Sequence, residues 1–246
     1  MMLPLTYEPE SVSAPDGGGP LAGKSAVCFG DSITWYDGHV YNWGKEEGKT
    51  AVGYESYLRL AGMTVQNEGI SGASIREIRE HILETDLRGF DYVLITSGAN
   101  DSRVGLPTGE LRPKAGPFDT GSFFGCLQSA VEHVLAVNGT ARIILMTPIR
   151  GWIYAPEGYA CRRTEDGEVE ERFAEAIQAV GMCYGCTVCD WYHESGIEKE
   201  TMSLYINDPD PDRSAAHNPN ALYSLHPSSA GFARMAKLLL SCMKEE

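Results

Sequence analysis

Residues 26–34 read AVCFGDSIT, an apolar run that passes directly into a turn of small and polar residues. The run predicts a buried first strand, and the turn places the hydroxyl of Ser32 at the carboxyl end of that strand. Ligands of open parallel sheets bind at this edge, so the pattern indicates a nucleophile displayed in a crevice. The alternative at this point is an ordinary turn between a strand and a helix, in which Gly, Asp and Ser are also common.

Apolar runs alternate with amphipathic segments along the rest of the chain, which is typical of a doubly wound sheet. We expect strands near residues 25–30, 64–67, 91–97, 142–147 and 187–190, and helices near 53–61, 74–85, 120–137, 168–184 and 229–243. Right-handed crossovers and short connections favour a five-stranded parallel sheet in the flavodoxin-like order 2-1-3-4-5. The predicted fold class is therefore α/β, a single-domain three-layer α/β/α sandwich.

The length of 246 residues suits one α/β domain, which we place at residues 24–246. Residues 1–23 precede it as an expected flexible lead-in, because residues 11–20 are rich in Gly, Pro and Ser. Residues 102–119 and 148–167 are punctuated by Gly and Pro and lack periodicity. They are predicted to be loops over one edge of the sheet, where loops shape substrate specificity.

The formal net charge is −14, so the surface field is expected to repel phosphate backbones and anionic lipid headgroups. This charge argues against nucleic-acid and membrane partners and leaves a small molecule as the expected ligand. The first residues lack the basic segment and apolar core of a signal peptide, and no stretch approaches the ~18 apolar residues of a membrane span. The expected location is the cytoplasm, and the oligomeric state stays open.

Three of the seven cysteines, Cys183, Cys186 and Cys189, precede His193 at spacings that superficially resemble a zinc site. Cys189 falls inside the predicted strand at 187–190, whereas the ligands of a structural zinc site usually converge from a knuckle. We therefore expect no metal ion here.

Three further segments supply the groups that an acyl-transfer site needs: NEGISG at residues 67–72, SGAND at 97–101 and LHP at 225–227. With residues 30–34 they follow the order of motifs in the SGNH hydrolase superfamily, also called the GDSL esterases and lipases. The chain resembles this family from about residue 24 to its C-terminus. The resemblance implies the same fold and a serine hydrolase, for which we expect neither metal nor cofactor.

The resemblance assigns roles to individual residues. Ser32 matches the nucleophile, and His226 matches the general base because it precedes a proline just before the last predicted helix. The backbone N–H groups of Ser32 and Gly72 and the side-chain amide of Asn100 match the oxyanion hole. Gly72 and Asn100 have turn-forming roles as their structural alternatives. Asp101 is expected to brace its loop by accepting backbone hydrogen bonds.

The chain departs from the family pattern at Tyr223, where the family commonly has an aspartate that orients the histidine. Four possibilities stay open: a Ser32–His226 dyad, a backbone carbonyl at the second ring nitrogen, Tyr223 itself, or a carboxylate. The candidate carboxylates are Asp208, Asp210 and Asp212. We favour a dyad with a substitute acceptor, with Asp31 and Asp101 in supporting roles. Loss of the correctly charged orienter costs on the order of 10⁴ in turnover in serine-protease triads, so a weakened or inactive enzyme stays an alternative.

Aromatic residues gather after the proposed nucleophile, and others lie in the expected loop at 148–167. They are Trp35, Tyr36, Tyr41 and Trp43 in the first segment and Trp152, Tyr154 and Tyr159 in the second. These rings could stack on sugars or acyl chains, or they could cover the sheet edge and close a core.

Together these features predict a hydrolase of carboxylic esters with small acyl groups, acting through an acyl-Ser32 intermediate. An acetylated carbohydrate is the first substrate class to test. One alternative is a lysophospholipase or thioesterase, which needs an apolar groove for its acyl chain. Another is a non-catalytic carbohydrate- or acyl-binding protein that kept the pocket and lost turnover.

Overall fold

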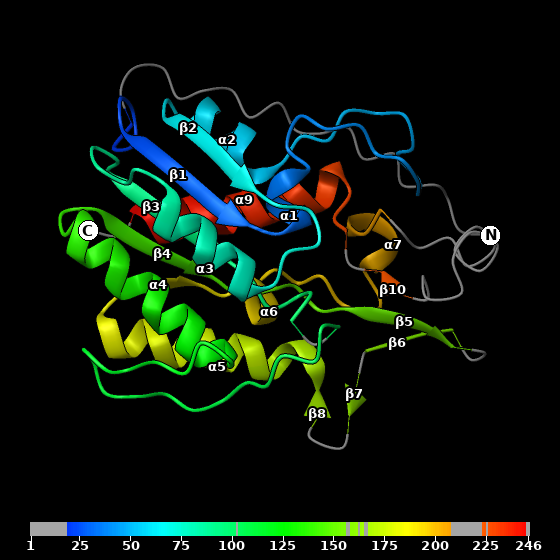
Figure 1. The fold of residues 1–246 in the computed structure, drawn as a ribbon. Coiled ribbons are helices and arrows are strands. Elements are labelled where there is room, and N and C mark those ends of the chain that lie inside the picture. Colours follow the sequence, from blue (N-terminus) through cyan, green and yellow to red (C-terminus); the bar gives the residue numbers. More distant parts are fainter. Residues whose placement is uncertain are drawn as a thin grey trace, which may run out of the picture.

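A five-stranded parallel sheet forms the centre of the molecule (Figure 1). The computed structural model describes residues 19–101, 103–155, 158–161, 163–164, 167–207, 223–224 and 226–244. The strands of the sheet are β1 Ser25–Gly30, β2 Thr64–Gly69, β3 Tyr92–Thr96, β4 Arg142–Met146 and β9 Thr187–Cys189. Their order is β2-β1-β3-β4-β9, which confirms the predicted topology.

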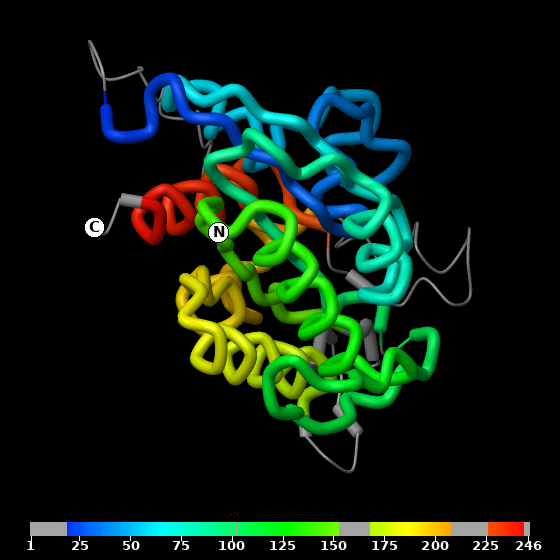
Figure 2. Tube along the Cα trace, turned by 60° about the vertical axis from the view of Figure 1, so that its left-hand side comes forward, coloured from blue at the N-terminus to red at the C-terminus, as the bar shows by residue number. Residues whose placement is uncertain are grey.

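Helices cover both faces of this sheet, which gives the three predicted layers (Figures 1 and 2). The helices α2 Tyr54–Leu60 and α9 Ser229–Lys244 pack on one face. The other face carries α3 Ile75–Glu84, α4 Phe123–Val137 and α5 Val169–Tyr184, which Figure 2 shows as neighbouring coils.

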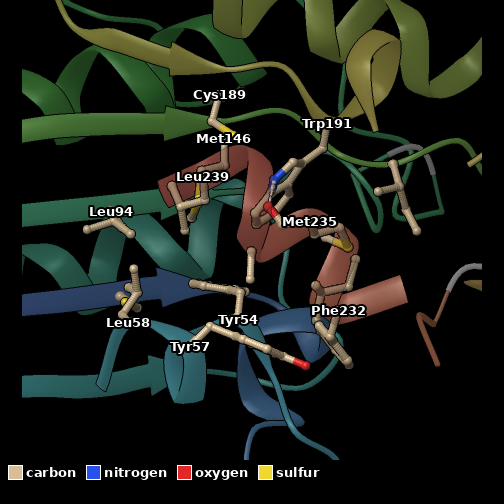
Figure 3. Close-up of a cluster of buried hydrophobic side chains, with 14 of the residues drawn as sticks. Tyr54, Tyr57, Leu58, Leu94, Met146, Cys189, Trp191, Phe232, Met235 and Leu239 are labelled. Carbon is tan, nitrogen blue, oxygen red and sulfur yellow. Dashed lines mark hydrogen bonds between the residues drawn. The ribbon is translucent and has the colours of Figure 1, made fainter. Parts of the chain in front are cut away.

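Alternate residues of the strands point to opposite faces, as a pleated strand requires. Ala26 and Cys28 of β1 join the core under α2 and α9, whereas Val27 and Phe29 join the core under the other three helices. Figure 3 shows the first of these cores, in which side chains of α2 and α9 meet those of the strands. Burial on both faces explains why β1 reads as a continuous apolar run.

Local capping signals set several helix ends. Ser74 and Glu77 form the capping box at the start of α3, as their spacing predicts. Ser122 caps α4 by accepting from the N–H of Gly125, so this helix begins three residues after the predicted start at residue 120. Gly185 ends α5 in the left-handed conformation with φ 71°.

The prediction of a loop over residues 148–167 is wrong. This segment contains β5 Trp152–Ala155 and β6 Gly158–Cys161, and β5 also pairs antiparallel with β10 Tyr223–Ser224. A second small pair consists of β7 Arg163–Thr164 and β8 Gly167–Glu168. Strands of two to four residues are too short to show a period in the sequence, and the pairing of β5 with β10 depends on a distant segment.

Three short helices complete the described elements: α1 Ser32–Trp35, α6 Trp191–Glu194 and α7 Met202–Tyr205. Most of the predicted lead-in, residues 1–18, lies outside the described residues, and its last part forms a turn in which Leu21 is buried. A search of the described residues finds no helix with the length and apolar character needed to cross a membrane.

Candidate active site

The residues of the turn at 30–34 lie where the sequence places them, at the carboxyl end of β1. Asp31 is the N-cap of α1, and its Oδ1 accepts a hydrogen bond of 2.9 Å from the N–H of Ile33. Ser32 is the first residue of this helix and is largely buried, with 6% of its surface exposed. A side chain at Gly30 would collide with Thr34, because its Cβ would lie 2.1 Å from Thr34 Oγ1. The glycine therefore permits the tight packing that fixes the serine.

His226 lies beside this serine although 194 residues separate them in the chain. Its Nε2 is 3.0 Å from Ser32 Oγ, within the range expected for a nucleophile and its base. The imidazole packs edge to face against Tyr36 and Trp43, with ring centroids 5.2 and 5.6 Å away. Two residues that the sequence pairs only by motif thus form a hydrogen-bonded dyad.

Two of the predicted oxyanion donors are backbone N–H groups, those of Ser32 and Gly72. Neither has an acceptor within the described part of the chain, so both donors are available to a ligand. Gly72 has φ +81°, a conformation that favours glycine. Its carbonyl accepts from Arg103 Nη2 at 3.2 Å.

The third predicted donor, the Asn100 amide, makes contacts within the protein. Its Nδ2 donates to the carbonyl of Ala73 at 3.1 Å and lies 3.4 Å from Asp31 Oδ2. The second distance exceeds the usual 2.7–3.2 Å for an N–H donor, so this contact is weak. Asn100 is 8% exposed and is held between the segments that carry Ser32 and Gly72.

Asp101 braces the site through backbone hydrogen bonds, as the sequence predicts. Its Oδ1 accepts from the N–H of Ile75 and its Oδ2 from the N–H of Gly98, both at 2.9 Å. The residue therefore ties the start of α3 to the loop that follows β3. Burial raises the pKa of Asp101 to about 7, although these two N–H groups oppose the rise.

Asp31 is a second buried carboxyl group within the site, with 2% of its surface exposed. Burial raises its pKa to about 6, while the hydrogen bond from Ile33 and the nearby charge of His226 lower it. The proximity of Asp31 also raises the pKa of Asp101. Ser32 thus directly follows one carboxyl group that retains its proton more readily than an exposed aspartate, and Asp101 is a second such group in the site.

The sequence leaves four possibilities for the group that orients His226. Asp208, Asp210 and Asp212 lie outside the described residues. Tyr223 lies in β10, where its backbone pairs with Ile153, and its side chain is outside the described part. The four possibilities at this position therefore stay as the sequence leaves them.

The aromatic side chains that the structure describes in the two segments differ in their exposure, and those of Tyr154 and Tyr159 lie outside the described part. Tyr36, Tyr41 and Trp152 are buried, which favours the core-closing role for these rings. Trp35 stacks on His39 with a centroid distance of 3.7 Å. Trp43 differs from these four residues, because it is 46% exposed and its ring also contacts that of His226.

Among the described residues, no group of three or more His, Cys, Asp or Glu side chains could hold a metal ion. Cys189 is buried in β9, and His193 Nδ1 is 2.8 Å from Asp190 Oδ2. Sequence reasoning missed Asn207, a buried residue whose backbone N–H donates to the carbonyl of His226 and whose side-chain amide bonds to the backbone of Trp43 and Glu46. No motif or period marks this residue.

The family model for the GDSL-like Lipase/Acylhydrolase family matches residues 28–234. The chain belongs to this family. The match contains all four motifs, from Ser32 to His226. Membership of the GDSL-like family supports assignment as a hydrolase.

Solved structures of GDSL-like and related proteins share the fold at low sequence identity. A possible lipase from Chitinophaga pinensis is 22% identical with a TM-score of 0.67, over 89% of this chain and 97% of that chain. A catalytic mutant of Axe2, an acetylxylan esterase from Geobacillus stearothermophilus, is 21% identical with a TM-score of 0.58, over 92% and 96% of the two chains. A search of curated proteins finds no match.

Proposed function

We propose that this GDSL-like protein hydrolyses carboxylic esters with small acyl groups through a covalent acyl-Ser32 intermediate. The observation that carries the proposal is the 3.0 Å contact between Ser32 Oγ and His226 Nε2. A serine is a weak nucleophile at neutral pH unless an adjacent base takes its proton. The N–H groups of Ser32 and Gly72, which have no acceptor among the described residues, supply the second requirement, donors for a developing oxyanion.

The reaction proceeds in two halves. Ser32 Oγ attacks the ester carbonyl carbon while His226 Nε2 accepts its proton, and the carbonyl oxygen becomes an oxyanion bound by the two N–H groups. Asn100 Nδ2 adds a third donor by exchanging its weak 3.4 Å contact with Asp31 for the oxyanion. The imidazolium then protonates the leaving alcohol, which leaves an acyl-serine. Water attacks this ester with His226 again as base, and release of the acid restores the serine.

An acetylated carbohydrate is the substrate class that we propose first. Trp43 presents a half-exposed indole beside His226, and such a flat apolar surface suits the face of a sugar ring. The net charge of −14 disfavours anionic lysophospholipids relative to neutral esters. The name of the Axe2 structure, an acetylxylan esterase, supports acetylated xylo-oligosaccharides as the first natural esters to assay.

Hydrolysis of p-nitrophenyl acetate, butyrate and octanoate by the wild type, Ser32→Ala and His226→Ala tests this function. We expect acetate to be the best substrate and each substitution to lower kcat/KM by at least about 10³-fold, since either change disables the dyad. Full activity in Ser32→Ala would refute the proposal.

The same assay separates the alternatives. Activity that rises with acyl length would favour a lysophospholipase or thioesterase. A wild type that hydrolyses no ester, binds acetylated sugars and is not labelled at Ser32 by a fluorophosphonate would favour the non-catalytic binding protein.

A further inference from the structure

Asn207 lies after α7 and is fully buried, with 0% of its surface exposed. Each of its four polar groups has a hydrogen-bond partner. The N–H donates to the carbonyl of His226 at 2.8 Å, and the carbonyl accepts from the N–H of Lys45 at 2.9 Å. Nδ2 donates to the carbonyl of Trp43 at 2.9 Å, and Oδ1 accepts from the N–H of Glu46 at 2.8 Å. One residue therefore bonds both the general base and the loop at 43–46.

The loop at 41–46 also forms hydrogen bonds with the segment that follows His226. The Tyr41 hydroxyl donates to the carbonyl of Pro227 at 2.8 Å. Glu46 Oε2 accepts from both the N–H and the hydroxyl of Ser229, each at 2.8 Å, at the start of α9. These contacts fix the chain on the C-terminal side of His226, whereas Asn207 holds the carbonyl of His226 itself.

Gly44 allows the loop backbone to lie directly against Asn207. Its φ is +87°, and a Cβ at this position would lie 2.4 Å from the Asn207 carbonyl oxygen. A side chain larger than hydrogen would therefore push the loop and Asn207 apart. The close contact between the loop at 43–46 and Asn207 therefore depends on the glycine.

This arrangement bears on the imidazole because Trp43 contacts its ring. The indole centroid is 5.6 Å from that of His226 at an angle of 70°, and Tyr36 contacts the ring at 5.2 Å and 71°. Asn207 binds the backbone of both Trp43 and His226. It thereby sets the distance between the imidazole and the indole of Trp43.

We propose that Asn207 is a positioning residue that holds His226 and Trp43 as one unit and so keeps Nε2 within hydrogen-bonding distance of Ser32. The proposal rests on the ester-hydrolase function proposed above. A displacement of about 1 Å in a reacting group can cost about 10²-fold in rate. Asn207→Ala keeps the N–H that binds the His226 carbonyl but loses the bonds of Nδ2 and Oδ1 to Trp43 and Glu46. It is therefore expected to release Trp43 from its place against the imidazole and to act on the chemical step by this route.

The test compares Asn207→Ala with Asn138→Ala. Asn138 is also buried, and its Nδ2 donates to the carbonyls of Leu87 and Phe90 at 2.9 Å, at the end of α4. Both variants lose an amide that bonds to backbone groups, so both lose stability. We expect Asn207→Ala alone to lower kcat for p-nitrophenyl acetate by about 30- to 100-fold, with KM changing less than kcat and with the same fall in the rate of fluorophosphonate labelling at Ser32.

An activity-independent measurement keeps this proposal separate from the function. The Hε1 proton of His226, identified as the NMR signal absent from His226→Ala, should be shifted by the ring currents of Tyr36 and Trp43, which pack edge to face against the imidazole. It should move toward the position of an exposed histidine in Asn207→Ala and stay in place in Asn138→Ala. If the wild type hydrolyses no ester but the signal behaves in this way, the function fails and the positioning role stands.

An unshifted Hε1 signal, or labelling and hydrolysis by Asn207→Ala within about threefold of Asn138→Ala, would overturn the proposal. Gly44→Ala carries the same test if Asn207→Ala does not fold, since it displaces the loop from Asn207 without deleting a hydrogen-bonding side chain. It should lower the labelling rate and move the Hε1 signal in the same direction. A wild-type labelling rate and a wild-type Hε1 shift in Gly44→Ala would equally overturn the proposal.

Discussion

Replacement of Asp101 by alanine should destabilise the protein through two specific hydrogen bonds. The carboxylate is fully buried and accepts from the N–H groups of Ile75 and Gly98, both at 2.9 Å. Each buried donor left without an acceptor costs about 1–3 kcal/mol, so the two bonds predict a loss of about 2–6 kcal/mol. Burial of the charged carboxylate is itself unfavourable, as its pKa of about 7 shows, and Asp101→Ala removes this unfavourable contribution. We therefore expect the lower half of this range, about 2–4 kcal/mol.

Urea unfolding at neutral pH, followed by tryptophan fluorescence, measures this loss by linear extrapolation. Asp101→Asn retains one acceptor oxygen and should fall between the wild type and Asp101→Ala. Asp119→Ala is the control, because its exposed Oδ1 accepts from the N–H of Gly121 at 2.9 Å and water can replace it. The control should stay within about 0.5 kcal/mol of the wild type. A loss below about 1 kcal/mol for Asp101→Ala, at an unchanged m value, would refute the role of these bonds.

Two further predictions concern pH and packing. Because the pKa of Asp101 rises from its ordinary 3.8 to about 7 in the folded protein, the folded state binds this proton more tightly than the unfolded chain does. Its contribution to the free energy of unfolding is therefore present at low pH and lost as pH rises toward 7, by up to about 3 kcal/mol between pH 5 and 8. Urea unfolding at several pH values should show that the free energy of unfolding of Asp101→Asn declines less steeply between pH 5 and 8 than that of the wild type. Equal declines in the two proteins would contradict the raised pKa of Asp101. Gly30→Ala should cost about 1–3 kcal/mol, because its Cβ would lie 2.1 Å from Thr34 Oγ1 and 2.5 Å from Thr96 Cγ2. Thermal unfolding measures this loss, and a wild-type Tm would show that the turn has room to relax.

The central sheet and its long helices could be predicted because they repeat a strong local pattern. β1 is buried on both faces and therefore reads as an unbroken apolar run, and α3 begins at a capping box visible in the sequence. Parallel strands place their carboxyl ends at one edge, so the neighbours β1 and β3 bring Ser32 and Asn100 together. Local pattern and topology were sufficient for these features.

The small antiparallel sheet and the network around Asn207 could not be predicted in the same way. β5 pairs with β10, which lies far along the chain, and each strand is too short for periodicity to be informative. Asn207 owes its role to the backbone of a loop more than 160 residues away. Asn100 likewise bonds to Ala73 and Asp31 in this structure, partners that depend on tertiary packing alone. Such contacts leave no local signal in the sequence.

The separation of 194 residues between Ser32 and His226 has a consequence for biosynthesis. A nascent chain completes the strand and turn that hold Ser32 early, but it receives His226 only shortly before its last helix. The apolar side chains of that helix, among them Phe232, Met235 and Leu239, close the core beneath the sheet (Figure 3). A chain still lacking them has a serine without its histidine and an uncovered apolar surface. Limited proteolysis of ribosome-bound chains of increasing length would therefore report the length at which this core closes.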